Sequence, residues 1–371
     1  MNALLVLLTL ATSVCLALAF PKEGPAAVLF CASLAAGTAY WVSRHRTHGR
    51  FLVHVFVSAV LLRVVVGSAI HHFGLQDFFG GDAVTYDYRG WALLEYWRGG
   101  MRHEDFERYL SFYLYRNWGM PYMVAGVYWL VGRNVLAVQY LNALLGAATA
   151  PVIFLCARHI FQNLRVAKVA ALFVAFFPSL ILWSSQALKD GPIVFLLAAA
   201  MLATLRLGER LSAQYLAVLL FALYGLLSLR FYVFYVTLAA VLCAFVIGMR
   251  PQKTTSLVRQ FAVIMVLGLA LTYLGVLRTA SVQFETYGNL QVLQNSRSDL
   301  VQSAASGFGQ DVDVSTTEGA LSAIPVGATY LLFAPFPWQV ANLRQSITIP
   351  EMVVWWASFP LLVVGIWFTV K

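Results

Sequence analysis

The chain has 371 residues, of which 60% are hydrophobic and 11% are charged, and its mean hydropathy is +0.75. About a quarter of the residues of a soluble domain are charged. The composition therefore excludes a soluble enzyme, a disordered protein and a secreted disulfide scaffold, and it indicates a polytopic membrane protein. The net charge of +9 would suggest nucleic-acid binding in a soluble protein, but basic residues here are expected to set the topology, and no nucleic-acid partner is predicted.

Ten apolar segments have the length of about 20 residues that a membrane-crossing helix needs. They lie near residues 1–20, 25–43, 51–70, 135–157, 165–184, 191–207, 213–229, 231–248, 258–277 and 350–370. We therefore predict an all-α bundle of about ten transmembrane helices that forms a single transmembrane domain over residues 1–371. Arg230 divides the long apolar stretch 213–248 into a tight hairpin. The short apolar segment 119–132, which contains Pro121, is predicted to be a juxtamembrane or re-entrant helix.

The distribution of charge supports this layout. With the N-terminus inside, the cytoplasmic segments hold twelve basic residues and one acid, a net charge of +11, whereas the opposite side has a net charge of −3. The positive-inside rule is satisfied at every cytoplasmic turn. The extracytoplasmic loops are then residues 71–118, 185–190 and 278–349, and the first and last of these contain most of the acidic residues.

Cysteine and histidine positions do not indicate a metal site. The four cysteines each lie inside an apolar run without metal-ligand spacing, and His71 and His72 end a span without a third ligand nearby. The first span contains Ala17-Leu18-Ala19, which resembles a signal-peptidase site, but no Lys or Arg precedes it in residues 1–10. A retained first helix is therefore predicted, and the orientation is the same in either case.

The first outer loop contains Gly80-Gly81-Asp82-Ala83-Val84-Thr85-Tyr86-Asp87. From Tyr86 onward, aromatic and aliphatic residues follow helical spacing with charges between them, which predicts an interfacial amphipathic helix. Asp82 precedes this helix, so it can be its N-cap, a general base towards a hydroxyl or a ligand of a divalent cation. Asp87, one turn further on, is expected to be solvated.

The segments that follow have a distinctive order. Trp118-Gly119-Met120-Pro121-Tyr122 opens the short apolar segment, Gln139-Tyr140-Leu141-Asn142 lies near the start of the next span, and Gln186-Ala187-Leu188-Lys189-Asp190 precedes a later one. This order resembles the GT-C superfamily of polytopic glycosyltransferases, in particular bacterial proteins similar to glycosyltransferase family 39 and the protein mannosyltransferases. The resemblance extends from about residue 80 to residue 207.

The resemblance implies roles for residues of two outer loops. In the superfamily, the first outer loop has an acid in a Gly-Asp-Ala-like context followed by Tyr, which corresponds to Asp82 and Tyr86. The second outer loop has another acid, which corresponds to Asp190. Metal-using relatives present paired acids there, whereas this chain has Asp190 beside Lys189. We therefore expect no metal, with Mg²⁺ or Mn²⁺ as the less favoured alternative, and a phosphate contact by Lys189. Alternatively, Lys189-Asp190 caps the helix that begins at Gly191-Pro192.

Two further segments are candidates for lipid contact. Arg230 stands between two apolar runs, where it either binds a lipid-linked phosphate or extends to headgroups. The late loop has a polar part, 303–317, and an aromatic part, 324–338, whose three prolines argue against a regular span. The aromatic part is expected to line a groove for a polyprenyl chain or to stack on a sugar. Alternatively, Trp338 only anchors it at the interface.

Together with these features, the resemblance implies an inverting glycosyltransferase that uses a polyprenyl-phosphate-linked sugar at the extracytoplasmic face of a bacterial inner (plasma) membrane. The predicted partners are this lipid-linked donor, a glycan, lipid or protein acceptor, and membrane lipids. The predicted catalytic residues are Asp82 and Asp190, and the predicted substrate-binding residues are Tyr86, Asp87, Arg89, Lys189, Arg230 and Trp338. The alternatives are a polysaccharide polymerase, a lipid or polysaccharide transporter, and a non-catalytic membrane subunit.

The charge asymmetry leads to a test of topology. In cysteine-accessibility labelling of intact cells, positions near Asp82, Asp190 and Ser303 should react from outside, and positions near Gln162 and Lys253 should be protected. A position near Arg46 should also be protected. Labelling of the Asp82 and Asp190 regions from opposite sides would contradict a shared site.

Overall fold

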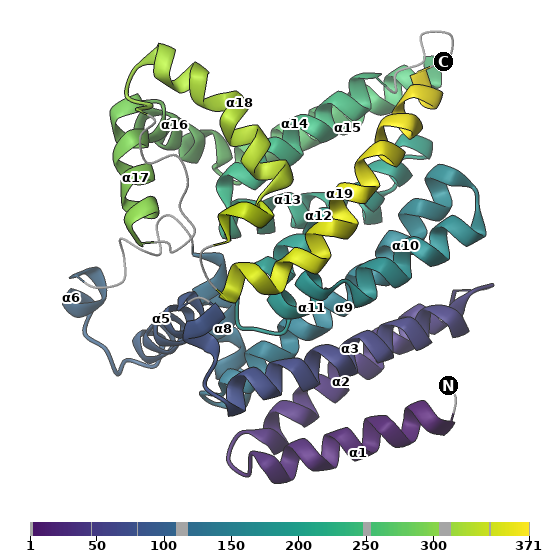
Figure 1. Ribbon diagram of the computed structural model, residues 1–371, viewed down its shortest axis with the longest axis vertical. Coiled ribbons are helices and arrows are strands. Elements are labelled where there is room, and N and C mark those ends of the chain that lie inside the picture. The colour runs from purple at the N-terminus through teal and green to yellow at the C-terminus, as the bar shows by residue number, and fades with distance from the viewer. Residues whose placement is uncertain are drawn as a thin grey trace. The chain divides into compact units, whose positions relative to one another are not determined.

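The structure is a computed structural model, and it describes residues 3–45, 47–79, 81–108, 118–247, 254–303, 313–340 and 343–370. These residues form helices and contain no β-strand (Figure 1), which confirms the predicted all-α class. Gly80, Arg46, Lys253 and residues 304–312 of the late loop, which the sequence analysis singled out, lie outside the described residues. The chain divides into two compact units, Met1–Gly268 and Leu269–Lys371.

The first unit is a helical bundle. Its helices before the central spans are α1 (Ala3–Ala19), α2 (Gly24–Ser43), α3 (Gly49–His72), α4 (Gln76–Phe79), α5 (Asp82–Trp97), α6 (His103–Phe106) and α8 (Gly119–Val131). The remaining helices are α9 (Val135–Phe161), α10 (Leu164–Phe176), α11 (Pro178–Ser184), α12 (Asp190–Glu209), α13 (Ala213–Leu229), α14 (Phe231–Ile247) and most of α15 (Thr254–Tyr273). Helices α1, α2 and α3 lie side by side (Figure 1).

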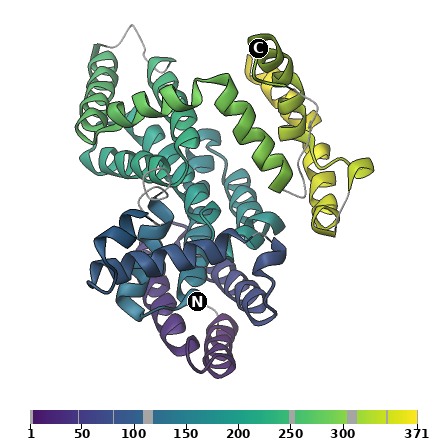
Figure 2. The same ribbon diagram turned by 90° about the vertical axis from the view of Figure 1, so that its left-hand side faces the viewer.

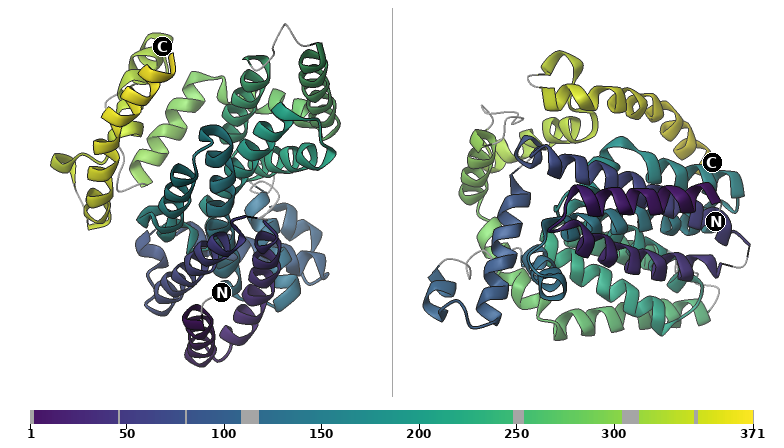
Figure 3. Two further views of the ribbon diagram at one scale, coloured as in Figure 1. Left: turned by 90° about the vertical axis from the view of Figure 1, so that its right-hand side faces the viewer. Right: turned by 90° about the horizontal axis from the view of Figure 1, so that it is seen from below.

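Helix α9 forms the centre of the bundle. It packs against α2, α3, α10 and α12, and most of its apolar length is buried. Alanines and glycines such as Ala143, Gly146 and Ala147 lie on its buried surface, so neighbouring backbones can approach closely. Figure 2 views the unit from the end that carries α5, and the right panel of Figure 3 shows α5 running across the ends of the N-terminal helices. The amphipathic sequence of α5 fits this interfacial position.

Each of the ten predicted spans coincides with a helix or a broken helix. The helices long and apolar enough to cross a membrane are α2, α3, α9, α12 and the segment Gln345–Phe368. Helices α1, α13, α14 and the segment Leu257–Tyr273 are apolar but slightly shorter. Arg230, in an extended conformation, separates α13 from α14, which confirms the break predicted there. The chain is therefore an integral membrane protein with a helical bundle.

One predicted span, 165–184, is broken where the sequence analysis expected a continuous helix. Helices α10 and α11 meet at an angle of 50°. Pro178 has no N–H with which to continue the helix, and it holds Phe177 in an extended conformation. The carbonyl oxygens of Val174 and Ala175, at the end of α10, instead accept hydrogen bonds of 3.2 and 2.7 Å from Arg63 of α3. A buried arginine therefore replaces backbone donors that the break removes.

The second unit contains the late helices α16 (Val276–Tyr287), α17 (Leu290–Ser303), α18 (Thr317–Phe333) and α19 (Leu343–Val370), with a 3₁₀ turn, η2 (Pro337–Gln339). The indole N–H groups of Trp355 and Trp356 donate to the carbonyl oxygens of Leu332 and Phe333, and so join α19 to the end of α18. The three prolines of 324–338 were expected to exclude a regular span there, and α18 is not among the helices long and apolar enough to cross a membrane, although Pro325 lies inside it. A single proline removes one helical hydrogen bond, and the helix ends only before Pro335 and Pro337.

Candidate functional site

A cavity of about 400 Å³ in the first unit brings together residues from distant parts of the sequence. Asp82 begins α5, Asp190 begins α12 and Arg230 lies between α13 and α14, and all three line this cavity. The other lining residues are Arg63, Phe79, Gly146, Thr149, Val174, Leu180, Trp183, Ser184, Leu188, Gly191 and Val194. The site thus has charged groups and an apolar lining.

The two aspartates occupy equivalent positions in their helices. Each is the first helical residue, and the N-cap positions are taken by Gly81 and Lys189, neither of which makes a side-chain capping bond. The capping roles considered for Asp82 and for Lys189-Asp190 are therefore not found. A carboxylate in the first turn still interacts favourably with the positive end of the helix dipole. Both carboxylates remain available to the cavity.

Asp190 and Arg230 form an ion pair. An Nη2 atom of Arg230 lies 3.1 Å from Oδ1 of Asp190, and both side chains are about one-third exposed. The Nε atom of Arg230 is buried and has no hydrogen-bond partner within the described structure. Asp82 is exposed, and the described part of the chain contains no hydrogen bond or ion pair to its carboxylate. The two acids of the cavity therefore differ, because among the described residues only Asp190 forms a direct ion pair, whereas Asp82 interacts with the charge of Lys189 at longer range.

Two predicted binding residues lie beside these groups. The Lys189 Nζ atom lies 5.8 Å from the centroid of the Tyr86 ring, and Tyr86 is 6% exposed. Burial and the neighbouring Asp82 raise the pKa of the Tyr86 hydroxyl, so it stays protonated. Burial, followed by the positive charge of Arg230, lowers the pKa of Lys189. The positive charge of Arg89 acts to lower the pKa of both Tyr86 and Lys189. This environment contains an excess of positive charge, which favours an anionic ligand.

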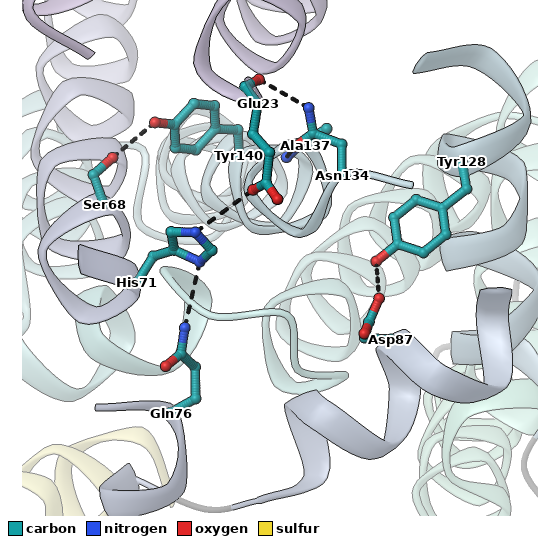
Figure 4. Close-up of polar contacts among 9 residues, drawn as sticks. All are labelled: Glu23, Ser68, His71, Gln76, Asp87, Tyr128, Asn134, Ala137 and Tyr140. Atoms are coloured by element: carbon teal, nitrogen blue, oxygen red, sulfur yellow. Dashed lines mark hydrogen bonds and ion pairs between the residues drawn. The ribbon is translucent and has the colours of Figure 1, made fainter. Parts of the chain in front are cut away.

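Asp87 has a different environment from the solvated one expected. Its carboxylate accepts a hydrogen bond of 2.6 Å from the Tyr128 hydroxyl (Figure 4). It also pairs with Arg133 at 2.7 Å. The guanidinium of Arg133 also lies 4.9 Å from the Trp91 ring centroid. The hydrogen bond to Asp87 raises the pKa of Arg133. Asp87 does not line the cavity, and its contacts attach α5 to α8 and to Arg133, which lies two residues after the end of α8.

A second polar group supports the same end of the bundle. Asn134 caps α9, because its side-chain oxygen accepts a hydrogen bond from the Ala137 N–H, and its amide nitrogen donates to the carbonyl oxygen of Glu23 (Figure 4). The carboxylate of Glu23 pairs with His71 at 3.5 Å. Glu23 is thereby the partner that the sequence did not suggest for His71. No group of three or more His, Cys, Asp or Glu side chains suited to a metal occurs in the described ranges.

Arg63 is a cavity residue that the sequence analysis did not assign to the site. Its side chain is 1% exposed, and its Nε atom donates to the Ser184 hydroxyl at 2.8 Å. An arginine inside an otherwise apolar span was the available signal, because buried charges in membranes are rare and usually functional.

Trp338 belongs to the second unit, where it is exposed and stacks on Phe336. Its role in binding stays a prediction.

Comparison with known proteins agrees with the resemblance described above. Residues 118–276 match a family model described as dolichyl-phosphate-mannose-protein mannosyltransferase. No curated protein and no solved structure matches the chain. The family match confirms the resemblance to GT-C glycosyltransferases and supports a membrane glycosyltransferase of the mannosyltransferase-like kind. Lys189, Asp190 and Arg230 lie inside the matched segment, whereas Asp82 and Tyr86 lie before it.

The contacts of Asp87 lead to a stability prediction. Asp87→Asn and Arg133→Gln should each lower the free energy of unfolding by about 1 kcal/mol, with a coupling of about 0.5–1 kcal/mol between them, because the pair is only partly solvated. Thermal unfolding in detergent of the two single variants and the double variant measures this coupling. The exposed pair Arg102 and Asp105 is the matched control and should show a coupling near zero. A coupling no larger than that of the control would contradict the expectation.

Proposed function

We propose that the protein is an inverting glycosyltransferase that transfers a sugar from a polyprenyl-phosphate-linked donor to a hydroxyl of a glycan, lipid or protein acceptor. The convergence of Asp82, Asp190 and Arg230 on one cavity is the observation that supports this proposal. Three cations, Arg63, Lys189 and Arg230, lie in or beside a cavity with two carboxylates. This balance favours a substrate with a phosphate group.

The proposed reaction is a single displacement. Asp82 takes the proton of the acceptor hydroxyl as its oxygen attacks the anomeric carbon of the donor, because Asp82 is the cavity carboxylate without a direct ion pair among the described residues. The bond from that carbon to the phosphate oxygen breaks, and the lipid phosphate leaves with the bonding electrons. Arg230 and Lys189 stabilise the charge of the leaving phosphate, and Asp190 orients Arg230.

The proposed side of action is the extracytoplasmic face of a bacterial inner membrane. Asp82, Asp190 and Arg230 all belong to segments that the charge distribution assigns to the outside, and their convergence on one cavity agrees with that topology. Helix α5, which begins at Asp82, is positioned to hold a lipid-linked donor at the membrane surface. The cavity residues Phe79 and Trp183 offer aromatic surfaces for a sugar or an isoprene unit.

Two alternatives are separated from this proposal by specific features. A transporter would place exchangeable charges along a path through the membrane. Among the charged residues that line the cavity, Arg63 lies within a predicted span. Its hydrogen bonds go to backbone carbonyl groups and to Ser184, so it holds the fold together and does not form part of a path of exchangeable charges. A polysaccharide polymerase is distinguished by its product, because repeated transfer yields chains rather than a single added sugar.

The proposed base provides the first functional test. Asp82→Asn keeps the side-chain size and removes the charge, so the protein should fold while turnover falls by about 10² or more. The assay is the release of polyprenyl phosphate from polyprenyl-phosphate mannose in nanodiscs, with envelope glycans, lipids and peptides offered as acceptors. Asp105→Asn is the matched control, because Asp105 lies in the same loop, forms a surface ion pair with exposed Arg102 and does not line the cavity. A fully active Asp82→Asn protein would remove the proposed role of Asp82.

The proposed chemistry also predicts independence from divalent cations. Asp190 is neutralised by Arg230, and the second outer loop has no other acid, so a pair of metal-binding carboxylates is not formed there. Sugar transfer should therefore continue at an unchanged rate after chelation with EDTA. Loss of transfer on chelation, with recovery on addition of Mg²⁺ or Mn²⁺, would instead identify Asp82 and Asp190 as metal ligands.

A further inference from the structure

The segment before Lys189 is a buried part of the core, although it connects two helices as a loop. Residues 185–188 join α11 to α12 without regular secondary structure, and their exposed fractions are 0% for Ser185 and Gln186, 2% for Ala187 and 4% for Leu188. An irregular segment in an apolar interior has backbone carbonyl groups that need donors from elsewhere in the protein. The residues that supply these donors determine where the segment ends and therefore where Lys189 and Asp190 lie.

Asn142 supplies two of these donors. This residue of α9 is 0% exposed, and its side-chain Nδ2 atom donates to the carbonyl oxygens of Gln186 and Leu188 at 2.6 and 2.5 Å. An amide nitrogen has two hydrogens, so both are used on the same segment. The second carbonyl belongs to the residue immediately before Lys189. Asn142 itself does not line the cavity, so it acts on the site only through this segment.

The neighbouring helices allow the segment to lie this deep. A Cβ atom on Gly67 of α3 would lie 2.5 Å from the carbonyl oxygen of Ser185, and a Cβ atom on Gly146 of α9 would lie 2.4 Å from the Cβ of Ser184. Gly67 therefore leaves room for the backbone of the segment, and Gly146 leaves room for the side chain of Ser184, which ends α11 just before the segment. The donor groups of Asn142 then hold the segment in the space that the glycines provide.

We infer that Asn142 is a positioning residue of the cavity, which fixes residues 185–188 so that Lys189 and Asp190 face the substrate. This inference rests on the proposed function for its effect on catalysis, but the hydrogen bonds on which it depends are independent of the reaction. Without Asn142, the carbonyl groups of Gln186 and Leu188 lose their donors, and the segment should open towards water.

The same helix offers a matched control. Gln139 lies three residues before Asn142, is also 0% exposed, and has neither its amide nitrogen nor its amide oxygen bonded within the described structure. Asn142→Leu and Gln139→Leu both replace a buried amide by an aliphatic side chain. Only the first removes hydrogen bonds to the segment, so the two variants separate the effect of these bonds from the effect of a buried polar-to-apolar change.

The first experiment measures the opening of the segment directly. Cys15, Cys31, Cys156 and Cys243 are replaced by alanine, Ala187→Cys is introduced, and the rate of maleimide labelling is measured in detergent. Labelling should be slow in this background and in Gln139→Leu, and at least about tenfold faster in Asn142→Leu. Asn142→Ser, which keeps one donor, should be intermediate and serves as the main variant if Asn142→Leu does not fold. An unchanged rate in the Asn142 variants would overturn the inference.

The second experiment distinguishes a positioning role from a merely structural one. Transfer from polyprenyl-phosphate mannose is measured per folded molecule, and kcat/KM should fall by about 10² in Asn142→Leu, with KM for the donor raised, because Lys189 and Asp190 are displaced. Gln139→Leu should keep the wild-type kcat and KM. Wild-type constants in a folded Asn142→Leu protein would overturn the positioning role. Absence of transfer by the wild-type protein would overturn the proposed function alone, because the labelling rates do not depend on it.

Discussion

Backbone carbonyl groups that lie in the apolar interior without helical partners need donors, and this requirement organises the candidate site. Two buried polar side chains meet it on either side of α11. Arg63 donates to Val174 and Ala175 before the break at Pro178, and Asn142 donates to Gln186 and Leu188 after the helix ends. Because an unpaired carbonyl group in the interior of a membrane protein costs several kcal/mol, these bonds strongly favour one path of the chain. That path ends at Lys189 and Asp190.

The electrostatics of the cavity follow from this arrangement. Asp190 begins α12, where the buried segment ends, and its carboxylate lies 3.1 Å from the guanidinium of Arg230. The break between α13 and α14 places Arg230 at the same end of the bundle. The opposing aspartate, Asp82, belongs to α5, which is attached to α8 by the contacts of Asp87 with Tyr128 and Arg133. Among the described residues, one carboxylate thus forms a direct ion pair and the other does not. A difference of this kind assigns separate roles to two otherwise similar acids.

Several features of the site were predicted from the sequence because they depend on local chemistry. The break at Arg230 follows from one charged residue between two apolar runs, and the short helix α8 follows from its length. The environments of other residues were predicted incorrectly. Asp87 was expected to be solvated, but it pairs with Arg133. The two residues are 46 positions apart, and a local sequence pattern does not reveal a pairing over that distance. Asp82 was considered as the N-cap of α5, but it is the first residue of the helix, and Gly81 occupies the N-cap position.

The sequence by itself determined the class of the protein, the positions of its apolar helices and the side on which its acidic loops are expected, because hydropathy and charge bias are properties of short segments. The order of its motifs also indicated the glycosyltransferase resemblance that the family match over residues 118–276 confirms. Only the tertiary structure decided which polar residues meet. Arg63 and Asn142 each bond to backbone groups more than 40 residues away, and no local pattern specifies such a partner. Helix packing brings them together, so the tertiary structure also decided which acid of the cavity forms an ion pair.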